Sequence, residues 1–587
     1  MTSLVQQLSN IIGQVFEAEG LPADLGAVRV SDRPDLAQFQ CNGAMAAAKQ
    51  AKKNPRAVAD AVVARLQGNP IFSKIEIAGP GFINLAVTDD YLADYLAGIV
   101  RDVRCGVAPL VAGDVAVLDY GGPNIAKAMH VGHLRASIIG DTLRRIMAFG
   151  GFKTLGDVHM GDWGTQIGMV ISEMALRHPE WPYFDEGQSG PYPETSPFDM
   201  TELEAVYPAA AKICKEDEAR MEQARQATVE LQNGRAGYRA LWKHIVNVSI
   251  ESMKANFDSL NVHFDLWNGE SSVHDLIAPM AENLKAKGFA ILDEGALVVP
   301  VKRNDDQKEI PPLILYKRDG AVMYGTTDLA TIVERMDLYK PARIIYVVDQ
   351  RQNLHFEQVF RAARLSGIAP EAVELTFAGF GTMNGPDGKP FKTREGGILR
   401  LEDLIAMGQE KALSRLDEAD LAKDATPDER QQIARMVGIA AIKFADLQNQ
   451  RQADYIFDLD RLTSFEGKTG PYILYQAVRI KSLLRKAGDV PAQAVPFVLQ
   501  EGDRKLALLM TELPEVFAAG LRNYAPHVLC DYAYRLAQEF SSFYGNCHIL
   551  SEADEALKQS RLQLCRMALA QLSLLMELMG IQIPERM

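Results

Sequence analysis

The sequence predicts a multidomain α/β protein with a small α+β N-terminal domain, a split parallel-sheet α/β domain and an all-α C-terminal domain. Three observations lead to this prediction. Residues 115–145 run from an apolar strand pattern through a Gly-Gly-Pro loop into a helical pattern. Strand and helix patterns then continue up to residue 348, and after residue 405 the patterns are almost entirely helical. The expected domain boundaries are 1–108, 109–404 and 405–587.

The N-terminal part combines helical and strand patterns. Asn54-Pro55 is a favourable N-cap and first-turn pair, so it predicts a helix over 56–66. The stretch 75–87 predicts two short strands around a Gly-Pro-Gly turn. We expect the first helical pattern to be interrupted at Ser9–Asn10. These elements suffice for a small mixed domain.

The central part carries an expected insertion over about 180–290. Proline and glycine are dense at its start, and charged helical patterns follow. Ahead of it, residues 151–169 predict a second strand followed by a Gly-rich turn. Beyond it, strand patterns return at 290–301, 312–317 and 343–348, with a helix near 327–339.

Composition limits the class of protein. The chain is 47% hydrophobic and 24% charged, which is ordinary for a folded protein. A net charge of −14 argues against indiscriminate DNA binding but is compatible with local basic patches that contact RNA. The six cysteines form no CxxC pair, so we expect neither disulfides nor a structural zinc site. Without a signal peptide or an apolar run of membrane-spanning length, the sequence predicts a cytoplasmic protein.

The most informative motif is HVGH at 130–133, which follows the first strand of the α/β region. On a helix, His130 and His133 would share one face, so both imidazoles could point at whatever the preceding loop holds. A helix N-terminus attracts phosphate through its free N–H groups and its dipole. A cationic loop at Lys389–Arg394 could hold a triphosphate from the other side. Together they predict nucleotidyl transfer without a protein nucleophile, with Mg²⁺ accompanying ATP.

Simpler interpretations exist for both motifs. An HxxH pair is often a packing feature or half of a metal site, but no third zinc ligand stands at a familiar spacing, so we expect no protein-bound metal. A lysine-containing surface turn is usually just solvated. The strand, the Pro-Asn pair and the glycine between the histidines favour the functional interpretation.

A family resemblance rests on longer strings. HVGH matches the HIGH signature of class I aminoacyl-tRNA synthetases, and PNIAKAMHVGHLR resembles the arginyl-tRNA synthetases in particular. Further matching strings, in the same order, are GDWGTQIG (161–168), YGTTDLATI (324–332), VVDQRQNLHFEQVF (347–360), GKPFKTREGG (388–397) and PERM (584–587). The resemblance implies a Rossmann-like catalytic domain, an N-terminal tRNA-binding domain and a helical anticodon-binding domain. It also implies arginine–tRNA ligase activity, in which ATP activates L-arginine to arginyl-adenylate before transfer to the tRNA 3′ end.

The resemblance also implies roles for single residues. The catalytic and ATP-binding set is His130, His133, Gly132, Lys127, Lys389, Lys392 and Arg394. The arginine-binding set is Asp119, Asn124, Tyr324, Asp328 and Gln352. The carboxylates of its two aspartates suit a guanidinium. His159, Gln166 and His355 are expected in the same cleft. Thr393 stands where the second signature, KMSKS, has its second lysine, which leaves the division of roles among the cations open.

The RNA partner is expected at the C-terminal half. Residues 467–486 interleave aromatic and cationic side chains, which suit unpaired bases and phosphates, although an ordinary basic helix face has the same composition. We expect Tyr475, Arg479 and Met587 to contact tRNA(Arg). The expected partners are thus tRNA(Arg), L-arginine and ATP, and the expected state is a monomer. A nucleotidyltransferase for a smaller substrate and a non-catalytic RNA-binding protein remain the alternatives.

Overall fold

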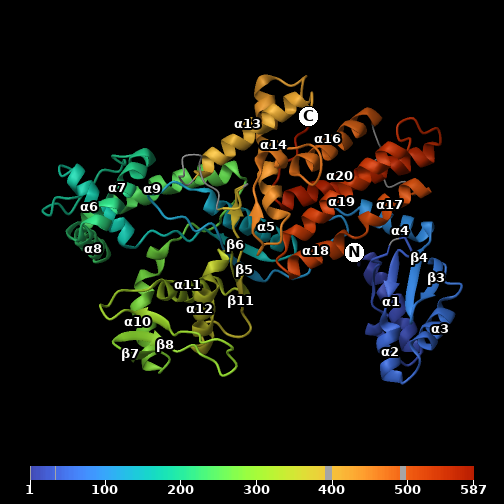
Figure 1. The fold of residues 1–587 in the computed structure, drawn as a ribbon, viewed down its shortest axis with the longest axis horizontal. Coiled ribbons are helices and arrows are strands. Elements are labelled where there is room, and N and C mark those ends of the chain that lie inside the picture. Colours follow the sequence, from blue (N-terminus) through green and yellow to red (C-terminus); the bar gives the residue numbers. More distant parts are fainter. Residues whose placement is uncertain (1, 34, 386, 390–398, 489–496) are drawn as a thin grey trace.

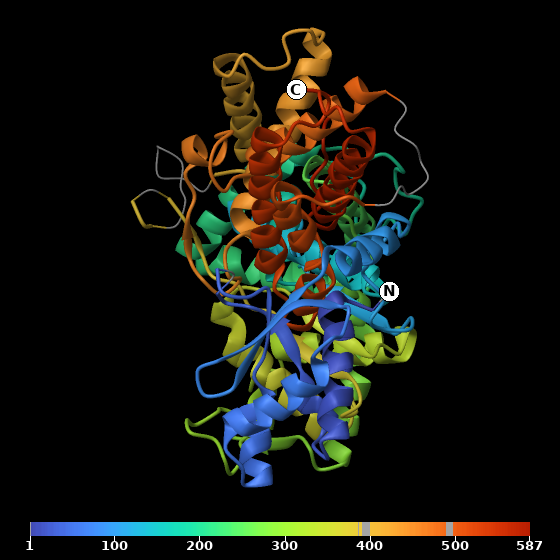
Figure 2. The same ribbon diagram turned by 90° about the vertical axis from the view of Figure 1, so that its right-hand side faces the viewer.

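The computed structural model describes residues 2–33, 35–385, 387–389, 399–488 and 497–587. In Figure 1 the N-terminal domain (blue) lies beside the C-terminal helices (orange and red), and the insertion helices α6 to α9 lie on the opposite side of the central sheet. Figure 2 shows the N-terminal domain below the C-terminal helices in the view turned by 90°. The N-terminal domain and the C-terminal helices therefore lie next to each other on one side of the catalytic region.

The N-terminal domain is a four-stranded antiparallel sheet with helices. Its elements are α1 (Leu4–Ala18), η1 (Ala23–Gly26), β1 (Val28–Val30), β2 (Phe39–Cys41), α2 (Gly43–Ala51), α3 (Pro55–Leu66), β3 (Phe72–Ala78), β4 (Phe82–Val87) and α4 (Asp89–Val100), with strand order β1-β2-β4-β3. The predicted helix and hairpin are confirmed. The predicted interruption of the first helix is wrong, because the Ser9 hydroxyl donates to the Val5 carbonyl and accepts from the Val28 amide, so α1 continues.

The catalytic region is built on a four-stranded parallel sheet of order β11-β10-β5-β6. Its strands are β5 (Val115–Asp119), β6 (Lys153–Asp157), β10 (Arg343–Tyr346) and β11 (Glu374–Phe377). Helix α5 (Leu134–Phe149) connects β5 to β6, and α12 (Asn353–Leu365) connects β10 to β11. The two β-α-β halves meet between β5 and β10. A topological switch point of this kind forms a crevice at the carboxyl ends of the strands.

Two additions separate the halves of this sheet. The first is helical, with α6 (Thr165–Arg177), α7 (Met200–Glu216), α8 (Glu218–Gln232) and α9 (Ala236–Ser259). The second comprises η3 (Glu270–Val273), α10 (His274–Ala286), β7 (Ile291–Asp293), β8 (Ala296–Val299), β9 (Leu313–Tyr316) and α11 (Tyr324–Tyr339). Strands β7, β8 and β9 form their own antiparallel sheet and do not join the parallel one. Turn η4 (Gln350–Gln352) and strand β12 (Met383–Asn384) follow β10 and β11.

The C-terminal region is helical apart from β13 (Tyr455–Ile456), which pairs with β12. Its helices are α13 (Leu401–Glu418), α14 (Pro427–Leu447), α15 (Leu459–Leu462), α16 (Gly470–Ala487), α17 (Glu501–Met510), α18 (Leu513–Arg522), α19 (Pro526–Asn546) and α20 (Glu555–Leu578). Among the described helices, none combines the length and apolarity needed to cross a bilayer.

Helix α5 ties the catalytic sheet to the helical region, which packs on its far side through α14, α18 and α20. Consequently α5 is buried along most of its length. The buried Arg135 guanidinium reaches Asp446 of α14, with Nε 3.0 Å from Oδ2. The buried Lys443 ammonium donates to the Leu260 and Gly580 carbonyls, and burial lowers its pKa to about 7. The Arg135–Asp446 ion pair thus links α14 to the helix that begins directly after His133.

Candidate active site

The histidine motif forms a tight turn ahead of α5, at the switch point of the sheet. His130 has an extended backbone (φ −127°, ψ 170°), and residues 131–133 make one short 3₁₀ turn, η2. The expectation that both histidines share a helix face is therefore wrong, because His130 precedes the helix. The two rings nevertheless lie together, with their centroids 4.1 Å apart.

Backbone hydrogen bonds set the tautomer of both rings. His130 Nδ1 accepts from the Gly132 amide at 3.0 Å, and His133 Nδ1 accepts from the His130 amide at 3.1 Å. A neutral imidazole that accepts at Nδ1 carries its proton at Nε2. Burial lowers the pKa of His130, and the positive charge of Lys127 adds to this effect. For His133, burial is the main cause and the charge of His130 the next, and together they lower its pKa to about 3. At neutral pH the turn therefore offers two uncharged Nε2–H donors.

Gly132 is required by the same turn. A Cβ atom at this position would lie 2.7 Å from Cε1 and 2.8 Å from Nδ1 of the His130 ring. Any side chain would therefore displace the ring from its bond with the residue-132 amide. The exposed glycine also leaves the outer surface of the turn open to a flat ligand.

Lys127 lies in the loop just before this turn and is half-buried. Its Nζ is 4.3 Å from the ring centroid of Tyr207, which comes from α7 of the insertion. The ammonium has no carboxylate partner among the described residues. Lys127 therefore adds a positive charge, without an anionic partner in the described part of the chain, near the two histidines.

The second cationic loop returns directly to the histidine turn. The Val131 amide donates to the Leu399 carbonyl at 3.1 Å, and the Leu401 amide donates to the Met129 carbonyl at 3.0 Å. His130 and Arg400 thereby form an antiparallel bridge. Lys389 is exposed at the start of this loop. Lys392, Thr393 and Arg394 lie outside the described residues.

The expected arginine pocket contains two acids that already have partners. The buried Arg335 of α11 places its Nη2 2.6 Å from Asp119 Oδ2 and 2.7 Å from Asp157 Oδ2, so it joins the ends of β5 and β6. Asp328, one turn after the exposed Tyr324 on α11, lies with Oδ2 2.5 Å from His355 Nε2. The structure thus pairs His355 with a predicted ligand residue. Asp119 is held by the protein's own guanidinium.

Three other predicted residues follow the carboxyl ends of β5, β6 and β10 in the chain. Asn124 bridges to Gly161 through the backbone, and its side-chain oxygen occupies the space that a Cβ at position 161 would need, 2.0 Å away. Gln352 is exposed at the end of η4, which follows β10. His159 has a left-handed backbone (φ 38°) and places Nε2 3.4 Å from the Thr331 hydroxyl.

Glu270 is a further acid that the sequence did not indicate. It begins η3, where its amide donates to the Met160 carbonyl. Its carboxylate has no hydrogen-bond or ion-pair partner among the described residues. Burial raises its pKa to about 7; His159 opposes this rise, and Asp162 and Asp328 add to it. The pKa of Tyr324 is raised by partial desolvation of its ring and by the charge of Glu270, so Glu270 lies near both Tyr324 and Asp328. No motif surrounds Glu270, so only the fold reveals it.

Ligand atoms of Asp119, Asp157 and His159 lie within 4.8 Å of one another, a spacing that could hold a metal ion. The Arg335 guanidinium already occupies both carboxylates, however. A second cation would compete with this buried ion pair. The residues therefore fit an internal arginine better than a metal.

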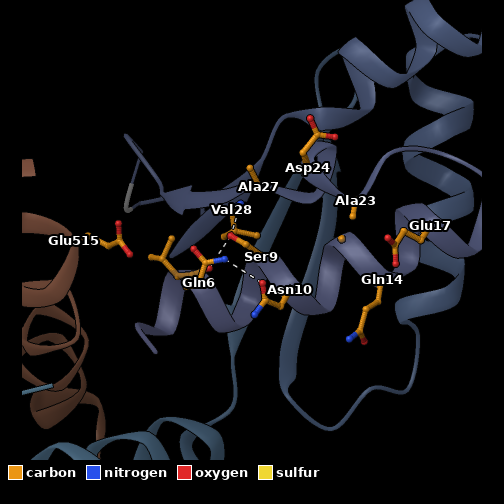
Figure 3. Close-up of a pocket in the computed structure, with 12 residues that line it drawn as sticks. Gln6, Ser9, Asn10, Gln14, Glu17, Ala23, Asp24, Ala27, Val28 and Glu515 are labelled. Atoms are coloured by element: carbon orange, nitrogen blue, oxygen red, sulfur yellow. Dashed lines mark hydrogen bonds between the residues drawn. The ribbon is translucent and has the colours of Figure 1, made fainter. Parts of the chain in front are cut away.

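A separate groove of about 570 Å³ lies between α1 and Glu515 of α18 (Figure 3). Its lining combines small and apolar side chains with side-chain amides and the carboxylates of Glu17, Asp24 and Glu515. Among the described lining residues there is no lysine, arginine or histidine. A triphosphate would meet only negative charge there. The groove is therefore no alternative to the histidine turn as a nucleotide site.

The predicted tRNA-contacting residues lie on the helical region. Tyr475 and Arg479 are half-buried on one face of α16, and the Arg479 guanidinium carbon is 4.0 Å from the Tyr544 ring centroid. Near Met587, Glu585 pairs with Lys481, Oε1 to Nζ at 2.6 Å, which fixes the C-terminal segment against α16.

The parallel sheet, its switch-point crevice and the histidine turn define a class I aminoacyl-tRNA synthetase. The family profile described as "tRNA synthetases class I (R), catalytic domain" matches residues 103–459. The profile described as "Arginyl tRNA synthetase N terminal domain" matches residues 2–87, and "DALR anticodon binding domain" matches residues 473–587.

Relatives that align over the whole chain identify the family within class I. The chain is 49% identical over 592 residues to the arginine–tRNA ligase of Alkaliphilus oremlandii and 49% identical over 590 residues to that of Hyphomonas neptunium, with 100% of each chain covered. The solved structure of the Plasmodium falciparum arginyl-tRNA synthetase matches with a TM-score of 0.82 at 25% identity. That of the Thermus thermophilus arginyl-tRNA synthetase matches with a TM-score of 0.79 at 22% identity, and this second match shows the fold alone. Both alignments cover 100% of each chain. The chain belongs to the arginyl-tRNA synthetase family. The predicted family and three-part fold are thereby confirmed.

Proposed function

We propose that this chain works as an arginine–tRNA ligase in the cytoplasm. It would activate L-arginine with ATP to arginyl-adenylate and pyrophosphate, and then transfer the arginyl group to the 3′ end of tRNA(Arg). The observation that carries the proposal is that hydrogen-bond donors suited to phosphate and acids suited to a guanidinium lie at the same crevice. Neutral donors and Lys127 stand at the histidine turn, and the acids Asp328 and Glu270 stand near Tyr324.

In the first step an arginine carboxylate oxygen attacks the α-phosphorus of ATP, and the bond to pyrophosphate breaks. Such a reaction needs positioning and stabilisation of charge on phosphate oxygens, and no protein nucleophile. The Nε2–H groups of His130 and His133 would donate to those oxygens, and Lys127 would add a positive charge. Mg²⁺ enters as part of the ATP substrate. We assign supporting phosphate contacts to Lys389, Lys392 and Arg394, and a surface for adenine to Gly132.

For amino-acid selection, the guanidinium of the substrate would lie between Asp328 and Glu270, with Tyr324 as a wall. Charge-assisted, forked hydrogen bonds favour a guanidinium over the ammonium of lysine. His355 would orient Asp328 through their short contact. We propose that Asp119, held by Arg335, shapes the floor of the pocket, and that Asn124 and Gln352 contact the amino and carboxylate end.

The tRNA would span the molecule from the helical region to the N-terminal domain. We place the anticodon side at Tyr475, Arg479 and Met587. On the N-terminal sheet, Arg29, Gln40, Asn84 and Glu76 form one row across four strands, and Gln40 Nε2 donates to Asn84 Oδ1 at 2.9 Å. Amide side chains suit the edges of unpaired bases. We propose that the protein acts on tRNA as a monomer.

The experiment that tests this function is ATP–pyrophosphate exchange with each amino acid, with and without tRNA, followed by aminoacylation of tRNA(Arg). We expect exchange with arginine and formation of AMP and arginyl-tRNA. Preference for lysine would contradict the assigned pocket. Activity that is indifferent to RNA throughout would favour a small-substrate nucleotidyltransferase, and tRNA binding without any catalysis would favour an RNA-binding protein.

A further inference from the structure

Helix α7 of the insertion reaches the phosphate-binding turn through two residues one helical turn apart. The Tyr207 ring lies against the Lys127 ammonium, and Glu204 Oε2 lies 2.7 Å from Arg400 Nη2. Residues at i and i+3 share a helix face. Leu203, Val206, Ala210 and Cys214 of α7 are buried in the insertion, and the partly buried Tyr207 lies beside this apolar face. The core packing of α7 thus holds the Tyr207 ring in place, and Glu204 at the edge of this face reaches Arg400.

The Tyr207 ring is what holds Lys127. A lysine has a long flexible stem, so ordering its ammonium costs rotamer entropy unless a contact favours one position. Within the described part of the chain, the ring of Tyr207 is the contact recorded for this ammonium, at 4.3 Å. Attraction between a cation and an aromatic face supplies the needed preference.

The position in which Lys127 is held is beside the histidines. Its charge lowers the pKa of both His130 and His133, after burial in each case. Ring and ammonium together therefore place a positive charge close to the two Nε2–H donors. A lysine pointing into solvent would be screened from the same phosphate oxygens.

The second contact aligns α7 with the other side of the turn. Arg400 forms the antiparallel bridge with His130, and its neighbours Leu399 and Leu401 bond to the backbone at residues 131 and 129. The Glu204–Arg400 ion pair thus connects α7 to the segment that follows the second cationic loop. The carboxylate of Glu204 is mostly covered, with 19% of its side chain exposed, so water screens the pair only partly.

We propose that Tyr207 is a positioning residue for adenylate formation. Its ring keeps the Lys127 ammonium where the phosphates of ATP would bind. The Glu204–Arg400 ion pair keeps α7 in a fixed position relative to the histidine turn. The inference rests on the proposed function. Tyr207 exchanges no proton and forms no bond with the substrate, so its effect on the reaction passes entirely through Lys127.

The first test compares Tyr207→Leu with Tyr207→Phe in ATP–pyrophosphate exchange with arginine and tRNA. We expect Tyr207→Leu to lower kcat by about three- to tenfold, the range of one cation–π contact, and to leave the arginine KM unchanged. Tyr207→Phe keeps the ring face and should retain most of the wild-type rate. Equal losses in the two variants would overturn the proposal. Tyr207→Met, with an unbranched side chain, replaces the leucine variant if thermal unfolding shows that variant to be unstable.

The second test is a double-mutant cycle with Lys127→Met. If Tyr207 acts through Lys127, adding Tyr207→Leu to Lys127→Met should cause no further loss of kcat. Independent, multiplying losses would overturn the proposal. Glu204→Gln should lower kcat about twofold, as expected for one partly exposed ion pair, whereas Glu216→Gln, exposed on the same helix, should match wild type. A wild-type protein that never uses arginine would instead contradict the proposed function.

Discussion

The two sides that we propose for the active-site crevice are built in different ways. The phosphate side centres on one short stretch of chain, in which neighbouring backbone amides orient His130 and His133 as neutral donors, and Tyr207 joins it from α7. The arginine side is assembled from distant segments, with Asp328 and Tyr324 on α11, Glu270 on η3 and His355 on α12. The first side is local and has uncharged histidines. The second is long-range and rich in carboxylates.

This difference matches the two ligands. A triphosphate brings its own negative charge and magnesium, so it needs donors that are already oriented. A guanidinium needs carboxylates, and several buried carboxylates repel one another unless cations compensate them. Arg335 provides that compensation for Asp119 and Asp157, and Asp328 and Glu270 are the acids that we propose for the substrate. The arginine side therefore depends on the fold more than the phosphate side does.

The largest effect should come from removing the internal guanidinium. Arg335→Met leaves two buried carboxylates without a partner, so we expect the free energy of unfolding to fall by about 3–5 kcal/mol. Chemical denaturation measures this change, with Asp337→Asn, an exposed charge on the same helix, as the control near wild type. An unchanged midpoint would mean that Arg335 does not hold the strand ends together.

On the phosphate side, His133→Ala removes one oriented donor. By analogy with the loss of an oxyanion donor, kcat of pyrophosphate exchange should fall by about 10²–10³-fold. The arginine KM should stay within about twofold, because the acid pocket is intact. A loss that appears mainly in the arginine KM would show that the two sides are not separate.

On the arginine side, Asp328→Asn removes a charged acceptor and leaves the shape of the residue. We expect the arginine KM to rise by about tenfold to a hundredfold, which corresponds to about 1.5–3 kcal/mol for a hydrogen bond to a charged group. The ATP KM should not change. His355→Gln, which loses only the partner of Asp328, should show a smaller rise. Equal losses for ATP and arginine in Asp328→Asn would contradict the assignment.

The smallest effect should be a pH dependence of arginine binding. Burial raises the pKa of Glu270 to about 7, with His159, Asp162 and Asp328 as the neighbouring charges. Below that pH the carboxyl is neutral and pairs poorly with a guanidinium. The arginine KM should therefore fall by up to about tenfold between pH 6 and pH 8. Glu270→Gln should flatten the profile at a high KM. A slope that survives this substitution would assign the titration to another group.

How far the sequence predicts each side follows from the same difference. The histidine turn could be predicted because strand, Gly-Gly-Pro loop and HVGH are contiguous, and the three-part fold because helical and strand periods change along the chain. The tautomers could not, because they depend on an extended backbone at His130 that a helical pattern does not predict.

On the arginine side, the contacts between distant segments could not be predicted from the sequence. Asp119 and Asp328 were accessible through motif resemblance, but their partners Arg335 and His355 are contacts between segments far apart in the chain. Glu270 on this side and Tyr207 on the phosphate side carry no local signature, and only folding brings them to the crevice. Likewise, α1 continues past Ser9, whose hydroxyl accepts a hydrogen bond from the Val28 amide of β1; no local sequence pattern indicates this contact.

The most direct test of the account measures the KM of ATP, the KM of arginine and kcat in pyrophosphate exchange for His133→Ala and Asp328→Asn side by side. The account predicts that the first variant loses kcat at a normal arginine KM, and that the second loses arginine affinity at a normal ATP KM. If both variants changed the same constants in the same proportion, the division of the crevice into a neutral phosphate side and an acidic arginine side would be contradicted.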